Sequence, residues 1–337
     1  MRRWKWTAFA LGIGLLAWRW SRILELLTRG SPLDRLAASV ALALPLFAAG
    51  ALAMPLEIRN RWVVRVAPRL VGGRAMTLGL VLSGVVCAAA VLAPVLITRD
   101  PVAIDLAHRL APPSWAHPLG TDLAGRDQLS RVLHGLRTSL AIALPAVFIA
   151  IVIGTAMGTT AAFLRRLDGV LMRVVDVGMA FPRVFLLLVL FAFWRTISIG
   201  AITLILGLTG WFHVTRLVRA EALAMRDTEF MLAARALGLP AWRKFTRHVL
   251  PNLAAPIIVT ATLGIGNVIL IESGLAYLGV GVSAPTPSLG RMINVGQTYL
   301  FTEPALAVVP GVTILVTVIA FSLLGDGLHH ALNPRSR

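Results

Sequence analysis

The chain has 337 residues, of which 57% are hydrophobic and 14% charged, and its mean hydropathy is +0.81. This composition excludes an ordinary soluble domain and indicates an all-α integral membrane protein. The formal net charge of +17 would suggest nucleic acid in a soluble protein, but cytoplasmic loops of membrane proteins collect Lys and Arg, so we expect no nucleic-acid partner.

The N-terminal region, residues 1–71, contains two hydrophobic segments. The stretch 6–18 is short for a span, whereas 36–56 carries no charge and reaches the roughly 20 apolar residues that a bilayer core requires. Basic residues from Arg59 to Arg74 are typical of a cytoplasmic loop, so 36–56 should run inward after an earlier span. The count predicts eight spans in the whole chain, with seven as the alternative.

Six further apolar segments follow. They cover residues 75–98, 138–164, 174–194, 196–212, 249–271 and 304–325. The Phe181-Pro182 pair should kink the third of these, because proline removes a backbone hydrogen bond. In the second, Gly154 and Gly158 form a Gly-x-x-x-Gly pattern that permits close helix packing.

The longest predicted cytoplasmic segment contains an amphipathic helix over residues 219–237. Its narrow apolar face is formed by Phe230, Ala233, Ala234 and Leu237. Gly238 then favours a left-handed cap that ends the helix. Such a helix either lies on the membrane surface or docks into a partner's groove, and the residues alone leave both alternatives open.

The stretch "AARALGLPAWRKFTRHVLPN" ends this segment and resembles the cytoplasmic loop of ATP-binding-cassette importer permeases. The family pattern is Glu-Ala-Ala, three residues, Gly, nine residues, Ile, one residue, Leu-Pro. The matching positions are Ala233, Ala234, Gly238, Leu250 and Pro251, whereas Leu232 and His248 depart from the pattern. The ending around His248 is similar to the dipeptide, oligopeptide and nickel branch of the family.

Three further stretches resemble the same branch, so the resemblance covers roughly residues 72–334. They are "HPLGTDLAGRDQLSRVLHGLRTSL" (117–140), "LDGVLMRVVDVGMAFP" (167–182) and "ESGLAYLGVGVSAPTPSLG" (272–290). The first points to the second permease subunit of the pair. The resemblance implies a six-span type I importer permease core over 72–334, preceded by an N-terminal extension with one or two extra transmembrane helices.

The resemblance also implies a coupling loop at residues 219–252 that contacts a cytoplasmic ATPase. The residues assigned to this contact are Phe230, Ala233, Ala234, Arg235, Gly238, His248, Leu250 and Pro251. The implied partners are a homologous second permease, two ATP-binding subunits, an extracytoplasmic solute-binding protein and membrane lipid. The implied location is the bacterial cytoplasmic (inner) membrane, with peptides as the main cargo and nickel as another.

No phosphate-binding loop, metal motif or nucleophile elbow occurs in the sequence, and Cys87 is the only cysteine. We therefore expect no catalytic residue, no metal and no cofactor in this chain, with ATP and Mg²⁺ used by partner subunits. Two alternatives from other classes are an ion-gradient-driven secondary transporter and a membrane-embedded enzyme. Neither internal repeats nor a cluster of intramembrane carboxylates and histidines supports them.

Charged residues outside the loop are further candidates. The outer-face motif consists of Gly120, Asp122, Gly125, Arg126 and Asp127, and it forms either a docking surface for the binding protein or a self-satisfied turn. Two acidic residues, Asp176 and Glu272, lie at or within predicted spans. We expect Asp176 to pair with Arg173 or Arg183, and Glu272 to lie near the outer interface, partly solvated.

Overall fold

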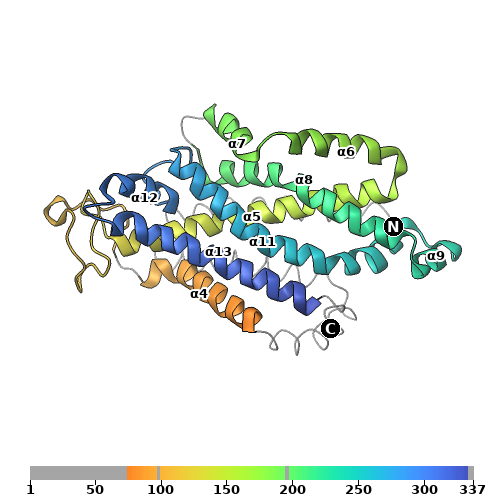
Figure 1. Ribbon diagram of the computed structural model, residues 1–337, viewed down its shortest axis with the longest axis horizontal. Helices are drawn as coiled ribbons and strands as arrows, with labels where there is room; N and C mark the ends of the chain where they lie inside the picture. The colour runs from red at the N-terminus through yellow and green to blue at the C-terminus, as the bar shows by residue number, and fades with distance from the viewer. Residues whose placement is uncertain (1–73, 97–98, 194–196, 333–337) are drawn as a thin grey trace, which may run out of the picture.

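The computed structural model describes residues 74–96, 99–193 and 197–332, and every regular element within them is helical (Figure 1). The expected N-terminal segments at 6–18 and 36–56 lie outside the described residues.

Among the described residues, five helices are long and apolar enough to cross a membrane. They are α4 (Arg74–Leu96), α5 (Gln128–Phe163), α8 (Ile199–Arg226), α11 (Leu250–Tyr277) and α13 (Ala305–Leu332). Helices α6 (Arg165–Ala180) and α7 (Arg183–Ala192) make a sixth candidate if they are counted as one span, because they meet at an angle of 81°. The protein is therefore an all-helical membrane protein, and its described residues hold five or six candidate spans.

The bend between α6 and α7 confirms the kink predicted at Phe181-Pro182. Phe181 adopts an extended conformation (φ −89°, ψ 133°), which is the region that a following proline favours. Pro182 then precedes the first turn of α7.

Short elements lie at both ends of the bundle. They are η1 (Leu106–His108), α9 (Glu229–Ala236), α10 (Ala241–Lys244), the π-helical turn η2 (Phe245–Val249), α12 (Leu289–Gly296) and η3 (Gln297–Tyr299). Helix α9 lies at one end of the molecule, while α12 and the loop before α5 lie at the other (Figure 1). We name these the α9 end and the α12 end.

The helix boundaries extend beyond the apolar stretches that predicted them. Helix α5 begins at Gln128 rather than near residue 138, because the Asp127 side chain accepts a hydrogen bond from the Ser130 amide at 2.8 Å and caps the helix. Helix α8 continues to Arg226, well past residue 212. Hydropathy finds the membrane-crossing part of a helix, whereas capping groups set where it starts.

Helices α5 and α8 pack closely along the Gly-x-x-x-Gly face. A Cβ atom on Gly154 would lie 2.5 Å from the Cβ of Val214, and one on Gly158 would lie 2.7 Å from the carbonyl oxygen of Thr215. Neither position has room for a side chain, so the predicted close approach is confirmed.

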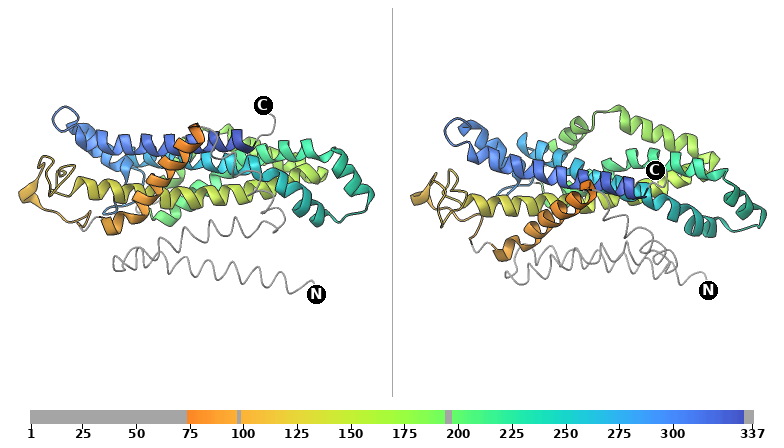
Figure 2. Two further views of the ribbon diagram at one scale, coloured as in Figure 1. Left: turned by 90° about the horizontal axis from the view of Figure 1, so that it is seen from below. Right: turned by 60° about the horizontal axis from the view of Figure 1, so that its bottom comes forward.

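Helix α4 crosses the bundle obliquely and packs on α13 (Figure 2). A Cβ on Gly79 would lie 2.4 Å from the backbone nitrogen of Leu324, so the two backbones nearly touch. Side chains such as Ile142 and Leu206 are fully buried in the core between the helices. Val81 and Val85 of α4 face outward and are exposed, as expected of a surface that meets lipid.

Candidate functional site

The predicted cytoplasmic helix 219–237 is two helices. The chain leaves α8 after Arg226, and the Thr228 hydroxyl donates a hydrogen bond to the Met225 carbonyl at 2.7 Å. This contact closes the end of α8, and α9 starts as a separate helix at Glu229. The expectation of one continuous helix was wrong because a local side-chain bond competes with helix continuation.

The inner side of α9 is anchored between two spans. Met231 is 1% exposed and packs in a cluster with Val214 and Val218 of α8 and with Val249 and Leu253 beside and within α11. Ala234, one turn from Met231 on α9, is also buried at 4%. A displacement of α9 therefore acts directly on α8 and α11.

The predicted apolar face of α9 is divided between two surfaces. Ala234 points inward, whereas Phe230, Ala233 and Leu237 are exposed, with Leu237 at 78%. We name Phe230, Ala233 and Leu237 the α9 row. Apolar side chains exposed at a helix end fit a groove on another protein.

Gly238 ends α9 in the conformation that the sequence predicts. Its φ angle is +65°, and the Leu239 amide donates to the Ala234 carbonyl at 3.1 Å, which is the long bond of a Schellman cap. An added Cβ would meet no atom within 4 Å, so glycine is required here by backbone conformation rather than by space.

The π-helical turn η2 joins α10 to α11 and ends two residues before Pro251. Proline has no N–H, and its ring conflicts with the carbonyl four residues earlier, so a widened turn at this position relieves the strain. Asn252 Nδ2 donates to the His248 carbonyl at 2.6 Å, and the rings of His248 and Phe230 lie 6.0 Å apart. His248 and Phe230 therefore meet, while Leu250 remains partly exposed. The side chain of Arg235 lies outside the described residues.

At the α12 end, the outer-face motif forms a self-satisfied turn. Asp122 Oδ1 accepts from the amides of Ala124 (2.8 Å) and Arg126 (3.0 Å), and its Oδ2 accepts from Arg126 Nε at 2.7 Å. Gly120 and Gly125 have φ angles of +75° and +72°, and a Cβ on Gly125 would lie 1.6 Å from the Asp105 carbonyl oxygen. The turn supports the alternative in which this motif fixes the entry to α5.

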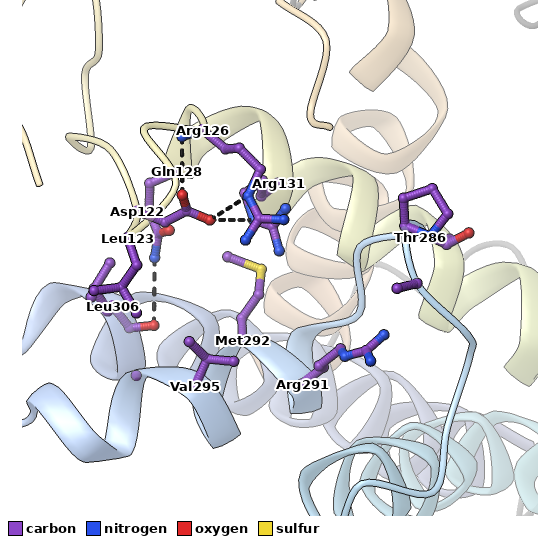
Figure 3. A pocket seen from close by; sticks show the side chains of 13 residues that line it. Asp122, Leu123, Arg126, Gln128, Arg131, Thr286, Arg291, Met292, Val295 and Leu306 are labelled. Carbon is purple, nitrogen blue, oxygen red and sulfur yellow. Dashed lines mark hydrogen bonds and ion pairs between the residues drawn. The ribbon is translucent and has the colours of Figure 1, made fainter. Parts of the chain in front are cut away.

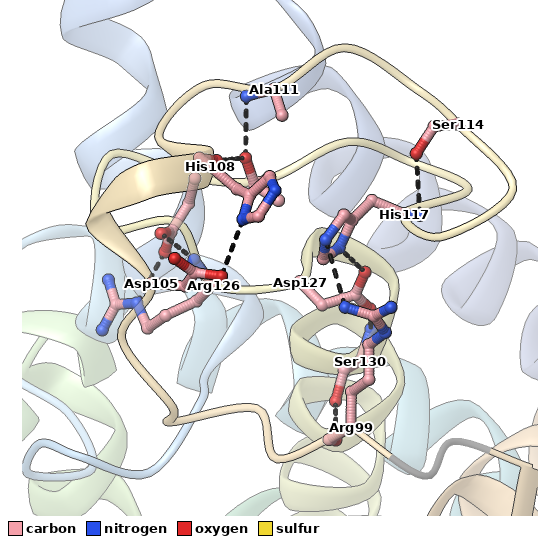
Figure 4. Close-up of polar contacts among 11 residues, drawn as sticks. Arg99, Asp105, His108, Ala111, Ser114, His117, Arg126, Asp127 and Ser130 are labelled. Atoms are coloured by element: carbon pink, nitrogen blue, oxygen red, sulfur yellow. Dashed lines mark hydrogen bonds and ion pairs between the residues drawn. The ribbon is translucent and has the colours of Figure 1, made fainter.

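The cap of α5 belongs to a second polar network (Figure 4). Asp127 Oδ1 lies 2.9 Å from His117 Nδ1, and His117 Nε2 lies 3.1 Å from an Arg99 guanidinium nitrogen. Because a guanidinium only donates, His117 Nε2 accepts, and the proton on Nδ1 points to Asp127. Ser130 adds a hydrogen bond to the Arg99 carbonyl at 2.9 Å. The loop before α5 is thereby fixed to the start of that helix.

Glu272 of α11 is buried at 1% exposure, so the expectation of a partly solvated position was wrong. Its carboxylate accepts hydrogen bonds from Ser139 of α5 at 2.8 Å and from Ser288 at 3.2 Å, with Ser273 at 3.5 Å. Ser288 directly precedes α12. Glu272 therefore connects two spans and α12, a role that the sequence did not indicate, because its partners are scattered along the chain.

We expected Asp176 of α6 to pair with Arg173 or Arg183, and this expectation was wrong. Asp176 binds Arg216 of α8 at 2.5 Å, and Asp168 of α6 binds Arg219 of α8 at 2.5 Å. The expectation considered only neighbouring turns of the same segment, whereas α6 lies alongside α8. These ion pairs join the bent segment to the bundle.

Comparison with known proteins agrees with these features. Residues 150–337 match the family "Binding-protein-dependent transport system inner membrane component". A Brucella suis biovar 1 protein, named "Putative peptide transport system permease protein", is 38% identical over 281 residues, which cover 83% of this chain and 94% of the relative. The dipeptide transport system permease protein of Alkalihalophilus pseudofirmus is 35% identical over 249 residues, which cover 74% and 82%.

These matches confirm the resemblance that the motifs indicated. The chain therefore belongs to the family of binding-protein-dependent transport system inner membrane components, and it is the permease, the non-catalytic membrane subunit, of an ATP-binding-cassette transport system.

Proposed function

We propose that the chain is the second permease subunit of an importer for dipeptides or oligopeptides. The relatives from Brucella suis and Alkalihalophilus pseudofirmus are named as peptide and dipeptide permeases, and the similarity covers most of their length. Peptides are favoured over nickel because both names carry a peptide as cargo. The ion-gradient-driven alternative is set aside, because the family works with binding proteins.

The proposed domain organisation follows the sequence. Residues 72–334 form a six-span type I core, in which α6 and α7 together make the third span. Residues 1–71 form an extension with one or two extra membrane segments and a basic cytoplasmic linker. The core pairs with a homologous permease, and the chain itself binds no nucleotide, since ATP and Mg²⁺ belong to two partner ATPases.

The observation that carries the proposal is the exposed α9 row at one end of the bundle, above a buried anchor. We infer that the α9 end is cytoplasmic and that Phe230 and Leu237 enter a groove on an ATPase. When ATP closes the ATPases, α9 is displaced. Because Met231 packs against both α8 and α11, the displacement passes to two spans and turns the pathway outward. The binding protein then delivers cargo at the α12 end.

The test is a Phe230→Asp variant of the tagged chain, purified in mild detergent from its native host. Phe230 is 42% exposed, so the substitution leaves the bundle core intact. A charge in place of an interface anchor costs at least about 2 kcal/mol, which weakens ATPase binding by roughly thirtyfold. We expect the variant to retain the homologous partner permease and to lose the ATPases.

Leu232→Asp is the matched control. Leu232 lies on the same helix with 49% exposure but outside the α9 row, and the family pattern has an acidic residue at this position. We expect this variant to retain all partners. If Phe230→Asp keeps the ATPases as well as the parent does, α9 does not dock and lies on the membrane surface instead.

A further inference from the structure

A cavity of about 240 Å³ lies at the α12 end of the bundle (Figure 3). One wall comes from the turn before α5 and from the first turn of α5, and the opposite wall comes from α12. The segment Ala284–Thr286 lies at one side of the cavity. Ala284 and Pro285 are exposed, so the cavity opens to the surface of the molecule. Known ligand pockets run from roughly 300 Å³ upward, so this one suits part of a solute rather than a long peptide.

The charges that line this cavity are mostly positive. Three guanidinium groups face one carboxylate, which leaves two positive charges in excess. Arg126 and Arg131 share the carboxylate of Asp122, at 2.7 Å and 3.3 Å from their Nε atoms. Arg291 approaches from α12, across the cavity (Figure 3). The third guanidinium therefore has no carboxylate of its own among the described lining residues.

The buried guanidinium is held in a fixed position. Arg131 is 8% exposed, and besides Asp122 it donates to the Pro101 carbonyl at 3.1 Å. Arg291 is exposed and donates to the Val282 carbonyl at 3.4 Å, a long hydrogen bond. Most of the five N–H donors of Arg291 therefore stay available to a ligand. Planar guanidinium groups prefer carboxylates, which they bind through two parallel hydrogen bonds.

Apart from Gln128 and Thr286, the remaining lining residues are apolar. Met292 and Val295 of α12 and Leu306 of α13 line the cavity together with the guanidinium groups (Figure 3). A cationic group next to apolar side chains suits a ligand that has both a carboxylate and an apolar side chain. The excess positive charge disfavours a metal cation such as nickel.

We propose that this cavity binds the C-terminal residue of a peptide in transit, with its α-carboxylate held by Arg131 and Arg291. Its side chain lies against Met292 and Val295. This assignment rests on the proposed function, because it requires a peptide as the cargo. The cavity recognises a feature common to all peptides, so it contributes a preference for a free C-terminus and not for a sequence.

The experiment compares uptake of alanyl-leucine with uptake of its C-terminal amide. The importer is purified from the native host with its partner subunits and reconstituted in liposomes with ATP inside. The ratio of the two initial rates is measured for the parent and for Arg291→Gln. Selection by the binding protein affects both complexes equally, so it cancels when the two ratios are compared.

We expect Arg291→Gln to lower the ratio of acid to amide by about three- to tenfold, since only the free acid loses a charge-assisted hydrogen bond. Val295→Asp, on another part of α12 and 43% exposed, should lower the ratio similarly by adding a repelling carboxylate. Arg109→Gln changes an exposed arginine at the same end that does not line the cavity, and it should leave the ratio unchanged.

Two results overturn the proposal in distinguishable ways. If Arg291→Gln and Val295→Asp slow uptake of both substrates equally, or slow uptake of neither, the cavity does not bind the peptide carboxylate. The proposed function as a peptide importer is unaffected by that result. If the parent complex transports no peptide at all, the proposed function fails and the cavity assignment fails with it.

Discussion

Replacing Glu272 should loosen α12 from the helix bundle and lower the stability of the whole permease. The carboxylate is the common acceptor for hydroxyl groups from α5 and from the residue before α12. Glu272→Ala removes this acceptor and leaves the hydroxyl groups of Ser139 and Ser288 buried. Ser139→Ala removes one donor and keeps the carboxylate.

The magnitude follows from the two shorter hydrogen bonds, at 2.8 Å and 3.2 Å. Hydrogen bonds to charged groups contribute about 1.5–3 kcal/mol in soluble proteins, but about 0.6 and at most about 1.7 kcal/mol between membrane helices. We therefore expect Ser139→Ala to cost about 1 kcal/mol. Glu272→Ala loses both bonds and leaves a cavity, and it should cost about 3 kcal/mol. Glu272→Gln keeps one acceptor oxygen and should cost less than half of that.

The assay is denaturant-induced unfolding of the purified chain in detergent micelles, with the free energy of unfolding taken from the transition. Thr138→Ala is the matched control for Ser139→Ala. Thr138 is the adjacent residue on α5 and is also buried, but its hydroxyl donates to the His134 carbonyl of its own helix at 3.0 Å. Such a bond adds little to packing between helices.

Two results would refute this reasoning. One is equal stability of Ser139→Ala and Thr138→Ala, which would mean that the contact between α5 and Glu272 contributes nothing. The other is a Glu272→Ala variant as stable as the parent.

Two further predictions concern other parts of the chain. Gly158→Leu should separate α5 from α8 and destabilise the protein by about 1–3 kcal/mol in the same unfolding assay. Gly84→Leu is the control and should be neutral, because nothing lies within 4 Å of its added Cβ. Equal losses of stability in the two variants would contradict the close packing of α5 and α8. The hydrogen bond from His108 lowers the pKa of Asp105 below its ordinary 3.8. The stability that this carboxylate gives to the loop before α5 is therefore fully present above pH 3.8 and is lost as the pH falls through the lowered pKa. Protection of the Ala107 amide, which donates to Asp105, against hydrogen exchange should therefore persist from about pH 7 to about pH 5, and loss of protection within that range would contradict this reasoning.

Features that depend on a few neighbouring residues were predictable from the sequence. Gly238 ends α9 in the left-handed conformation, and the Phe181-Pro182 pair separates two helices at a sharp angle. Gly154 marks a close helix contact, because only a residue without a side chain permits it. In each case the controlling physics is local to the backbone or to one helix face.

Partners that come from distant segments were not predictable. Asp176 pairs across 40 positions with Arg216, and Glu272 receives a hydrogen bond from Ser139 across 133 positions. Which polar groups meet depends on how each helix is rotated about its axis. That rotation is set by packing and leaves no signal in a sequence without periodic polarity.

The sequence alone determined that this protein is helical and membrane-embedded, and its motifs identified the family. These properties follow from hydrophobic length, from turn-forming residues and from motif spacing, all of which are one-dimensional. Only the tertiary structure decided that α9 has a buried anchor and an exposed row, that Glu272 holds α12, and that Arg291 completes a cavity begun by Arg131. Each of these sites joins side chains from separate helices, and their positions exist only once the helices have packed.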